Sequence, residues 1–224
     1  MPLTRKQLQR KPRIRRDMLY YERKYREAGK KVIIGVDEAG RGPLAGPVVA
    51  AAVCLLKDSF RSRIDDSKRL SPSQRDAAYL EIVPNSFYGI GIVNEAVIDR
   101  VNILVATQLA MEQAISELIG RIGSVNLDQV HVLIDGPVNL KVEFSNTKII
   151  KGDQKDRSIA AASIVAKVTR DRIMNIYDKI FPVYDFKQNK GYPTLKHRMA
   201  IKKFGRSSIH RVSFCGVKDK PKSG

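Results

Sequence analysis

Three short hydrophobic segments, each ending in an acidic residue, constrain the fold of this chain most strongly. The segments are KVIIGVDE, VHVLID and TKIIKGD, and they end in Asp37 with Glu38, in Asp135 and in Asp153. Segments of this length, rich in Val and Ile and followed or interrupted by glycine, are typical of buried strands. Because ligands of open α/β sheets collect beyond the carboxyl ends of the strands, we expect these acids to meet at one edge of a sheet.

The rest of the chain supplies further strands and several helices. In chain order, these are a helix in residues 17–31, a strand in 42–56, a helix beginning near Ser71, a strand at the start of 86–100, and helices over 96–120 and 158–180. Asp17 is the expected N-cap of the first of these helices, and the N-cap of the last is expected near Ser158. Strands that first follow one another and then alternate with helices predict a mixed sheet covered by helices, an α/β fold.

The net charge of +18 is concentrated at the two ends of the chain. Residues 1–31 hold 12 basic and three acidic side chains, and residues 195–224 hold nine basic and one acidic side chain. Such ends favour binding to nucleic-acid phosphates, although they are also typical of solubilising tails. If the N-terminus clamps DNA, deleting residues 1–15 will flatten the slope of log affinity against log salt, and an unchanged slope would refute the clamp.

Composition excludes several other classes of protein. The two cysteines, Cys54 and Cys215, lie 161 positions apart without a CxxC pair, which argues against a zinc knuckle and favours a reducing, cytoplasmic compartment. No run of about 18 uncharged apolar residues is present, so no membrane-spanning helix is expected. The basic N-terminus lacks the apolar stretch of a secretion signal.

The acids at the strand ends predict a metal site. Carboxylates about 4 Å apart repel by roughly 4 kcal/mol per pair at an effective dielectric of about 20, so the cluster requires raised pKa values or bound cations. Oxygen ligands without nearby His or Cys select hard ions such as Mg²⁺ or Mn²⁺. Two such ions about 3.5–4 Å apart activate water and stabilise the leaving oxygen in phosphodiester cleavage, which favours a nuclease. In the alternative interpretation each acid only caps a turn or a helix, which explains one such strand end more easily than three.

Asp37 and Glu38 are adjacent in one strand, and adjacent side chains of a strand point to opposite faces. They can share a site only if the chain bends there. The following residues 39–42, with the sequence AGRG, offer such a bend.

Several ordered motifs resemble those of the ribonuclease HII family. They are GVDEAGRGPLAGPVVAAAV at 35–53, DSKRLS at 66–71, LIDG at 133–136, KGDQKDRSIAAASIVAKVTRD at 151–171, GYPTLKH at 191–197 and SSIHRVSF at 207–214. The resemblance implies a ribonuclease H-like fold: a mixed five-stranded sheet flanked by helices, with a C-terminal helical segment. It also implies that the metal ligands are Asp37, Glu38, Asp135 and Asp153. Pro137 departs from the asparagine common in the family after Asp-Gly, which affects the expected loop but not the ligand.

The same resemblance assigns the substrate-binding residues. Gly40, Arg41 and Gly42 resemble the loop that recognises the 2′-hydroxyl at an RNA–DNA junction, since glycine lets the backbone approach a sugar closely. Tyr192 resembles the residue that stacks on the adjacent deoxyribose. The remaining expected contacts, all to phosphates, are Ser67, Lys68 and Lys167, of which Lys167 could equally be a solvated cation. His197 and His210 are expected to be structural.

The implied activity is hydrolysis of RNA in RNA–DNA hybrids and cleavage 5′ of single ribonucleotides in duplex DNA, with two Mg²⁺ or Mn²⁺ ions. The expected organisation is a basic, partly helical N-terminal extension at residues 1–30, a catalytic domain at 31–180, and a C-terminal substrate-binding segment with a basic tail at 181–224. A monomer is expected.

Two other functions fit part of the sequence. A junction resolvase or transposase-like enzyme would use similar acids but gives no reason for the GRG and GYPT elements. A non-enzymatic RNA-binding protein would use the basic ends but leaves the acids at the strand ends unexplained. A duplex with one ribonucleotide separates them, because only the ribonuclease HII interpretation predicts a nick beside it.

Overall fold

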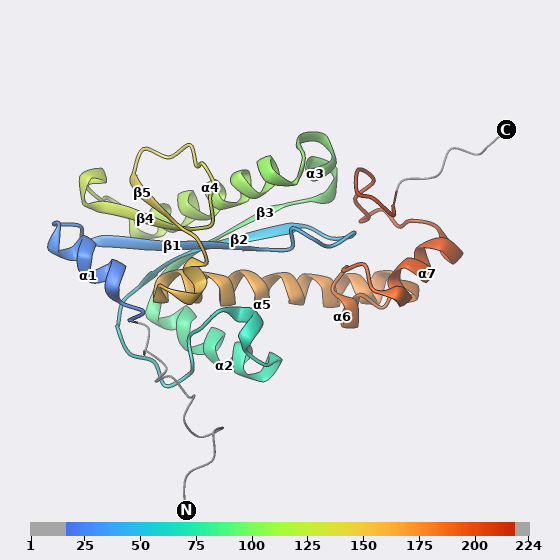
Figure 1. The fold of residues 1–224 in the computed structure, drawn as a ribbon, viewed down its shortest axis with the longest axis horizontal. Coiled ribbons are helices and arrows are strands. Elements are labelled where there is room, and N and C mark those ends of the chain that lie inside the picture. The colour runs from blue at the N-terminus through green and yellow to red at the C-terminus, as the bar shows by residue number, and fades with distance from the viewer. Residues whose placement is uncertain (1–16, 218–224) are drawn as a thin grey trace, which may run out of the picture.

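The computed structural model describes residues 17–217, and its centre is one five-stranded sheet (Figure 1). The strands are β1 (Val32–Ala39), β2 (Val48–Leu55), β3 (Ser86–Val93), β4 (Val130–Asp135) and β5 (Ser145–Ile149). Their order is β3-β2-β1-β4-β5; β1, β2 and β3 are antiparallel neighbours, whereas β4 and β5 run parallel to β1. The predicted mixed five-stranded sheet is confirmed. The predicted DNA clamp at residues 1–15 and the end of the basic tail lie outside the described residues.

Helices cover both faces of the sheet. They are α1 (Tyr20–Glu27), α2 (Pro72–Ile82), α3 (Glu95–Val101), α4 (Ile103–Ile122), α5 (Arg157–Ile180), α6 (Phe186–Asn189) and α7 (Leu195–Phe204). Helix α4 packs on one face and α5, with α2 beside it, on the other (Figure 1). The side chains of β2 alternate between the two faces of the sheet and so contribute to two separate cores: Ala50 and Ala52 face α4, while Ala51 and Val53 face α5. The C-terminal segment with α6 and α7 lies beyond one end of the sheet (Figure 1).

Glycines in the strands let the helices lie directly on the sheet. A Cβ atom added to Gly35 of β1 would lie 2.1 Å from the carbonyl carbon of Ser158 in α5. A Cβ on Gly91 of β3 would lie 1.8 Å from the carbonyl oxygen of Ala110 in α4. The first turn of α5 therefore rests on β1 just before Asp37, which fixes the distance between this helix and the acidic end of the sheet.

Two sequence-based helix boundaries were wrong, and the cap of a third helix lies two residues before Ser158. Residues 96–120 form two helices rather than one, because Asn102 adopts φ 72° and its side chain accepts hydrogen bonds from the first amides of α4. Helix α5 is capped by Asp156, whose carboxylate accepts from the amide of Ile159 at 3.1 Å, whereas the Ser158 hydroxyl donates to Glu22. Helix α1 begins at Tyr20, so that Asp17 precedes its cap.

Two buried carboxyl groups join α1 to the start of α5. Glu22 is 3% exposed, and Asp156 is fully buried with one oxygen, Oδ2, that has no hydrogen-bond partner within residues 17–217. Burial first, and then the Glu22 charge, raise the pKa of Asp156 to about 7. Because the pKa of an unfolded aspartate is about 3.9, the folded state binds more protons, and the free energy of unfolding falls as the pH rises from about 4 to 7.

The change Asp156→Asn is expected to remove this loss of stability. Asparagine keeps an oxygen that can cap α5 but carries no charge, so the free energy of unfolding should exceed that of the wild type by roughly 2–4 kcal/mol at pH 8 and by little at pH 4. Urea unfolding of both proteins at the two pH values measures this difference. An identical pH dependence in both proteins would show that Asp156 is ionised in the folded state.

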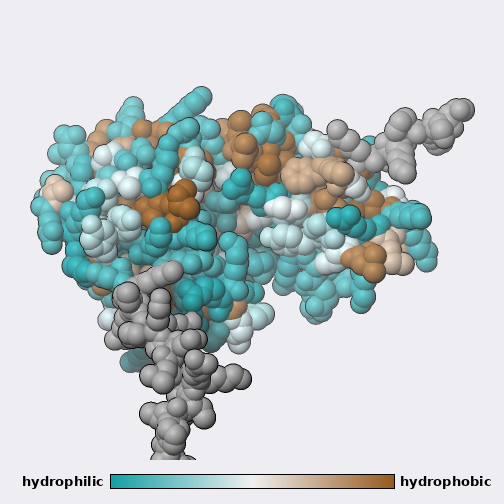
Figure 2. Space-filling view, viewed as in Figure 1, coloured by the Kyte–Doolittle hydropathy of each residue, from teal (hydrophilic) through white to brown (hydrophobic). Residues whose placement is uncertain are grey.

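Within the described part of the chain, no helix has both the length and the apolar character needed to cross a membrane. The face of the molecule in Figure 2 is mainly hydrophilic, with smaller hydrophobic groups between the polar ones.

Candidate active site

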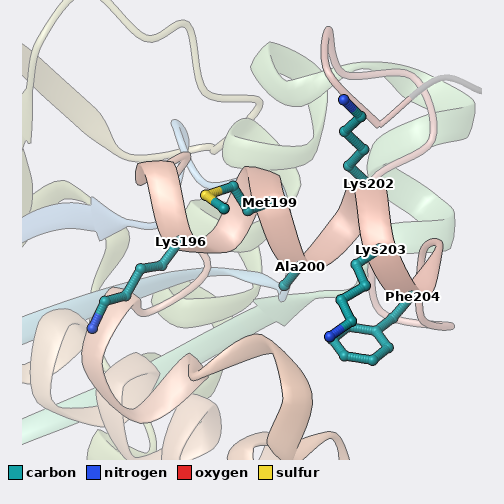
Figure 3. Close-up of a pocket in the computed structure, with 6 residues that line it drawn as sticks. All are labelled: Lys196, Met199, Ala200, Lys202, Lys203 and Phe204. Atoms are coloured by element: carbon teal, nitrogen blue, oxygen red, sulfur yellow. The ribbon is translucent and has the colours of Figure 1, made fainter.

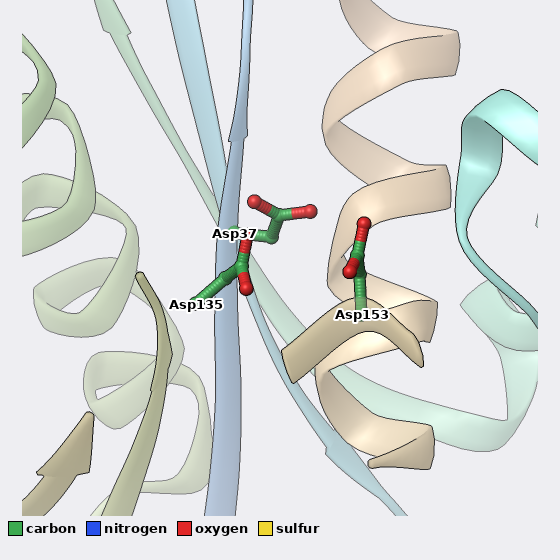
Figure 4. Close-up of side chains that lie close together, drawn as sticks. All are labelled: Asp37, Asp135 and Asp153. Carbon is green, nitrogen blue, oxygen red and sulfur yellow. The ribbon is translucent and has the colours of Figure 1, made fainter. Parts of the chain in front are cut away.

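Three carboxylates that are far apart in the sequence meet at one end of the sheet (Figure 4). Asp37, Asp135 and Asp153 each offer an oxygen atom, and these atoms all lie within 4.8 Å of one another. The parallel register that pairs Val36 with Ile134 places Asp37 beside Asp135, with both side chains on the α5 side. The oxygen-only donor set and the close spacing fit a hard divalent cation such as Mg²⁺ or Mn²⁺.

Asp153 reaches this cluster from a turn rather than from the end of a strand. The fifth strand was expected to continue to Asp153, but β5 ends at Ile149. Lys151 then adopts a left-handed conformation (φ 56°), and Asp153 lies on the short 3-10 helix Gly152–Gln154 before α5. The amide of Gly152 donates to Oδ1 of Asp135 at 2.6 Å, so the turn is tied directly to the second acid.

Glu38 is not part of the cluster of three carboxylates. The expected bend occurs at residues 40–42, where Gly40 has φ 100°, but Glu38 and Ala39 before it keep a regular antiparallel pairing with Ala50 and Val49 of β2. The Glu38 carboxylate instead accepts from Nη1 of Arg41 at 3.4 Å. The role of Glu38 as a fourth metal ligand stays a prediction.

Burial and mutual repulsion shape the electrostatics of the cluster. Burial, followed by the charges of Glu38 and Asp135, raises the pKa of Asp37 well above its usual range. Burial, with the charges of Asp135 and Asp66, raises the pKa of Asp153 to about 6. Both shifts show that negative charge is unfavourable here, which is the condition that a bound cation relieves.

Asp66 and Lys68 complete the polar surroundings of the cluster. Burial alone would lower the pKa of Lys68, but the charges of Asp37, Asp66 and Asp153 raise it overall, so this ammonium group faces the acids. Asp66, which we had not predicted, is 5% exposed; it accepts from the amide of Lys68 at 2.9 Å and from Gln154 at 3.2 Å. Its place directly before the predicted Ser67 and Lys68 is the only sequence feature that could have indicated it.

The predicted sugar-binding residues lie together where the chain leaves β1, the strand that carries Asp37. The Gly40–Gly42 segment begins three residues after Asp37, where β1 leads into the β1–β2 loop. A Cβ on Gly42 would lie 3.6 Å from Cε1 of Tyr192, so the loop and this ring are neighbours. The Tyr192 residue is 42% exposed, and Arg41 is exposed as well. The exposed Tyr192 ring therefore lies next to the loop backbone at Gly42, where no side chain intervenes.

Two of the predicted phosphate contacts are engaged within the protein. The Ser67 residue is buried, and its hydroxyl accepts from Ser163 of α5 at 2.9 Å. The Nζ atom of Lys167 donates to Asp171 at 2.6 Å. Lys167 nevertheless lines a cavity next to Tyr192, which is rich in cations: Arg75, Lys167, Arg172, Lys187 and Lys190, against the acids Asp76 and Asp171.

The two histidines lie away from the acids. His197 and His210 are fully or nearly fully buried, and their Nε2 atoms lie 3.0 Å apart. The other ring nitrogen of His197, Nδ1, lies 2.9 Å from the carbonyl oxygen of Tyr192. The pair therefore joins α7 to residues 207–214 and to the turn that carries Tyr192, as expected for structural residues.

Helix α7 presents a basic and partly apolar surface (Figure 3). A shallow groove there is lined by Lys196, Met199, Ala200, Lys202, Lys203 and Phe204. Met199 and Phe204 are more than half exposed. The lysines beside them make this end of the molecule positively charged.

Comparison with known proteins agrees with this geometry. The family model described as Ribonuclease HII matches residues 34–217. The chain is 49% identical over 207 residues to Ribonuclease HII of Syntrophus aciditrophicus, covering 92% of this chain and 94% of that protein. It is 48% identical over 204 residues to Ribonuclease HII of Listeria monocytogenes, covering 91% and 75%.

Solved structures share the fold at lower identity. RNase HII in the PCNA:RNase HII complex from Archaeoglobus fulgidus superposes with a TM-score of 0.66 at 24% identity, covering 83% of this chain and 96% of that chain. Bst-RNase HIII in complex with Mn²⁺ superposes with a TM-score of 0.63 at 17% identity, covering 87% and 70%. Taken with the sequence matches, these likenesses show that this chain belongs to the ribonuclease HII family and is a hydrolase of the ribonuclease H type.

Proposed function

We propose that this enzyme cuts the RNA strand of RNA–DNA hybrids and nicks duplex DNA on the 5′ side of a single embedded ribonucleotide, using two Mg²⁺ or Mn²⁺ ions. The observation that carries the proposal is the cluster of three carboxylates, together with the Gly40–Gly42 segment that begins three residues after Asp37 and lies beside the Tyr192 ring. A phosphodiester bound at the acids would place its sugar against this loop and ring.

The residues of the cluster fit a role in holding cations. Asp37, Asp135 and Asp153 would bind the ions, with Glu38 as the further ligand that the family resemblance implies. When bound, the ions supply water activation and stabilisation of the leaving oxygen. The Lys68 ammonium group, which faces the acids, would contact a phosphate of the substrate once cations neutralise the carboxylates.

The loop and the ring would recognise the ribonucleotide. The 2′-hydroxyl is the group that distinguishes RNA from DNA at a given position. The Gly40–Gly42 backbone can approach it closely, and the Tyr192 ring offers a flat apolar face with a polar tip for the neighbouring sugar. Arg41, whose guanidinium group is exposed, would add a contact from the same loop.

Basic side chains away from the acids would bind the phosphates of the same duplex. The cation-rich cavity beside Tyr192, which includes Lys167, and the lysines of α7 lie along the C-terminal half of the molecule. Their interactions carry no sequence information, so they would bind hybrids and ribonucleotide-containing DNA alike. We also propose that the enzyme acts as a monomer in the cytoplasm, where its free thiols Cys54 and Cys215 would stay reduced.

The test is cleavage of three duplexes of one sequence: all-DNA, DNA with one ribonucleotide, and an RNA–DNA hybrid. With Mg²⁺ or Mn²⁺ we expect a single nick 5′ of the ribonucleotide, leaving 3′-hydroxyl and 5′-phosphate ends, several cuts in the RNA strand, and no cut in all-DNA. The variant Asp37→Asn should cut none of them. Cleavage of all-DNA, or cleavage of the hybrid alone, would contradict the proposed substrate range.

A further inference from the structure

Two arginines are completely buried beneath the loop that joins β1 to β2. Arg170 comes from α5, and Arg211 comes from the segment after α7; each is 0% exposed. Arginine is rarely buried to this extent unless its donors are satisfied. Within residues 17–217, neither guanidinium group forms an ion pair with a carboxylate, and both instead donate to carbonyl oxygens.

Arg211 binds both ends of the loop at once. Its Nη2 atom donates to the carbonyl oxygens of Gly40 at 2.6 Å and of Gly46 at 2.7 Å. Its Nη1 atom donates to Arg41 O at 3.0 Å, and its Nε atom to Gly46 O at 2.9 Å. One planar group therefore holds the Gly40–Arg41 backbone at a fixed distance from Gly46.

Arg170 extends this network toward the Tyr192 turn. It donates to the carbonyl oxygens of Pro47 at 2.9 Å, Ala45 at 3.1 Å and Lys190 at 2.9 Å. Lys190 lies two residues before Tyr192, so the same side chain holds the loop and the Tyr192 turn. The amide of Leu44, which donates to Gly191 O at 2.8 Å, adds a direct bond between the two segments.

The glycine at position 40 is required by this packing. Gly40 has φ +100°, and a Cβ there would lie 2.1 Å from Nε of Arg170. The buried guanidinium group of Arg170 therefore explains why position 40 is glycine. Gly42 differs, because its φ lies outside the left-handed region and it faces the Tyr192 ring.

Carboxyl groups balance these charges from a distance: Asp171 acts on Arg170, Asp99 acts on Arg211, and Glu95 acts on both. Glu95 is 8% exposed, its Oε1 has no hydrogen-bond partner within the described residues, and it interacts electrostatically with both arginines. Since the donors of Arg170 and Arg211 go to backbone oxygens, their main effect is on the shape of the loop.

We propose that Arg211, supported by Arg170, is a positioning residue that sets the ribonucleotide specificity of the enzyme by holding the Gly40–Gly42 backbone at a fixed distance from Tyr192. The inference rests on the proposed function, because it assumes that this loop and ring detect the 2′-hydroxyl. Lysine cannot replace arginine here, since a single ammonium group lacks the planar set of five donors that reaches several carbonyls.

The test compares Arg211→Lys with the wild type in two assays. The first is kcat/KM on a duplex with one ribonucleotide, and the second is the inhibition constant of the all-DNA duplex of the same sequence. We expect kcat/KM to fall by about tenfold or more, because the hydrogen bonds to the sugar are misaligned. The inhibition constant should change by less than about twofold, because phosphate contacts remain.

Leu118→Ala is the control for general loss of stability. Leu118 is fully buried in α4 on the opposite face of the sheet, so this variant lowers stability without touching the loop. Its kcat/KM and inhibition constant should stay at wild-type values at a temperature where it is folded. If Arg211→Lys fails to fold, Arg170→Lys is used in its place, with the same expected separation of the two constants.

The outcomes decide between the two proposals. An unchanged kcat/KM overturns the positioning role. The role is also overturned if the inhibition constant of all-DNA rises by the same factor by which kcat/KM falls. If the wild type shows no preference for the ribonucleotide, the proposed function fails instead. Hydrogen exchange of the residue 40–47 amides then still tests the loop: exchange faster in Arg211→Lys than in Leu118→Ala supports the positioning role, and equal exchange refutes it.

Discussion

Replacing Asp135 by asparagine is expected to abolish cleavage while leaving the metal-free protein at least as stable as the wild type. The loss of one shared ligand should lower kcat/KM by about a thousandfold or more, which corresponds to about 4 kcal/mol. The stability of the folded protein should not fall, because the asparagine oxygen can still accept the 2.6 Å hydrogen bond from the Gly152 amide. Removing one charge also relieves repulsion on Asp37 and Asp153, the two acids whose pKa it helps to raise.

Two measurements check this prediction: the cleavage rate with Mg²⁺ or Mn²⁺, and the melting temperature in a chelator. The matched control is Asp128→Asn, which changes an exposed aspartate at the start of β4, the opposite end from Asp135. The control should leave both quantities unchanged. A lower melting temperature for Asp135→Asn in the chelator would contradict the picture of mutually repelling acids, and retained cleavage would remove Asp135 from the active site.

The second large effect is expected from Gly35→Ala. The new methyl group would lie 2.1 Å from the backbone of Ser158, and neither β1 nor the first turn of α5 can move without disturbing the sheet. Because overpacking against backbone forces a shift of whole elements, we expect a loss of about 3 kcal/mol or more. For a domain of this size, this corresponds to a melting temperature lower by about 6–12 °C.

Gly120→Ala provides the matched control for this change. Gly120 lies within α4, where an added Cβ meets no atom within 4 Å. The same substitution there should stabilise the protein by about 1 kcal/mol, because glycine is unfavourable in a helix interior. Thermal unfolding of both variants measures the two shifts. Similar small shifts would show that α5 can move away from β1 at little cost.

The sequence alone was sufficient to predict the sheet and the meeting of Asp37 with Asp135. Asp135 is the last residue of its strand and Asp37 lies two residues before the end of its own, and parallel neighbouring strands bring such ends together. The position of Asp153 relative to its strand was not predictable in the same way. The turn that carries it depends on the left-handed conformation of Lys151, a residue type that gives no local indication of this geometry.

Other features depend on contacts between distant segments. The local sequence offers both Asp156 and Ser158 as caps of α5, and the choice depends on a distant contact, because the Ser158 hydroxyl is engaged by Glu22 of α1 while Asp156 caps the helix. Arg170 and Arg211 lie in basic stretches that look solvent-exposed in the sequence. Their burial results from the C-terminal segment folding back onto the β1–β2 loop, where Ala45 pairs with His210.

We expect Asp37, Asp135 and Asp153 to hold divalent cations in common. A crystal structure of the wild-type enzyme soaked in Mn²⁺, with anomalous scattering recorded at the manganese edge, tests it most directly. We expect an anomalous peak bonded to carboxylate oxygens of all three residues, and no such peak in Asp37→Asn at the same Mn²⁺ concentration. Manganese bound elsewhere, with the three carboxylates left without a common ion, would contradict it.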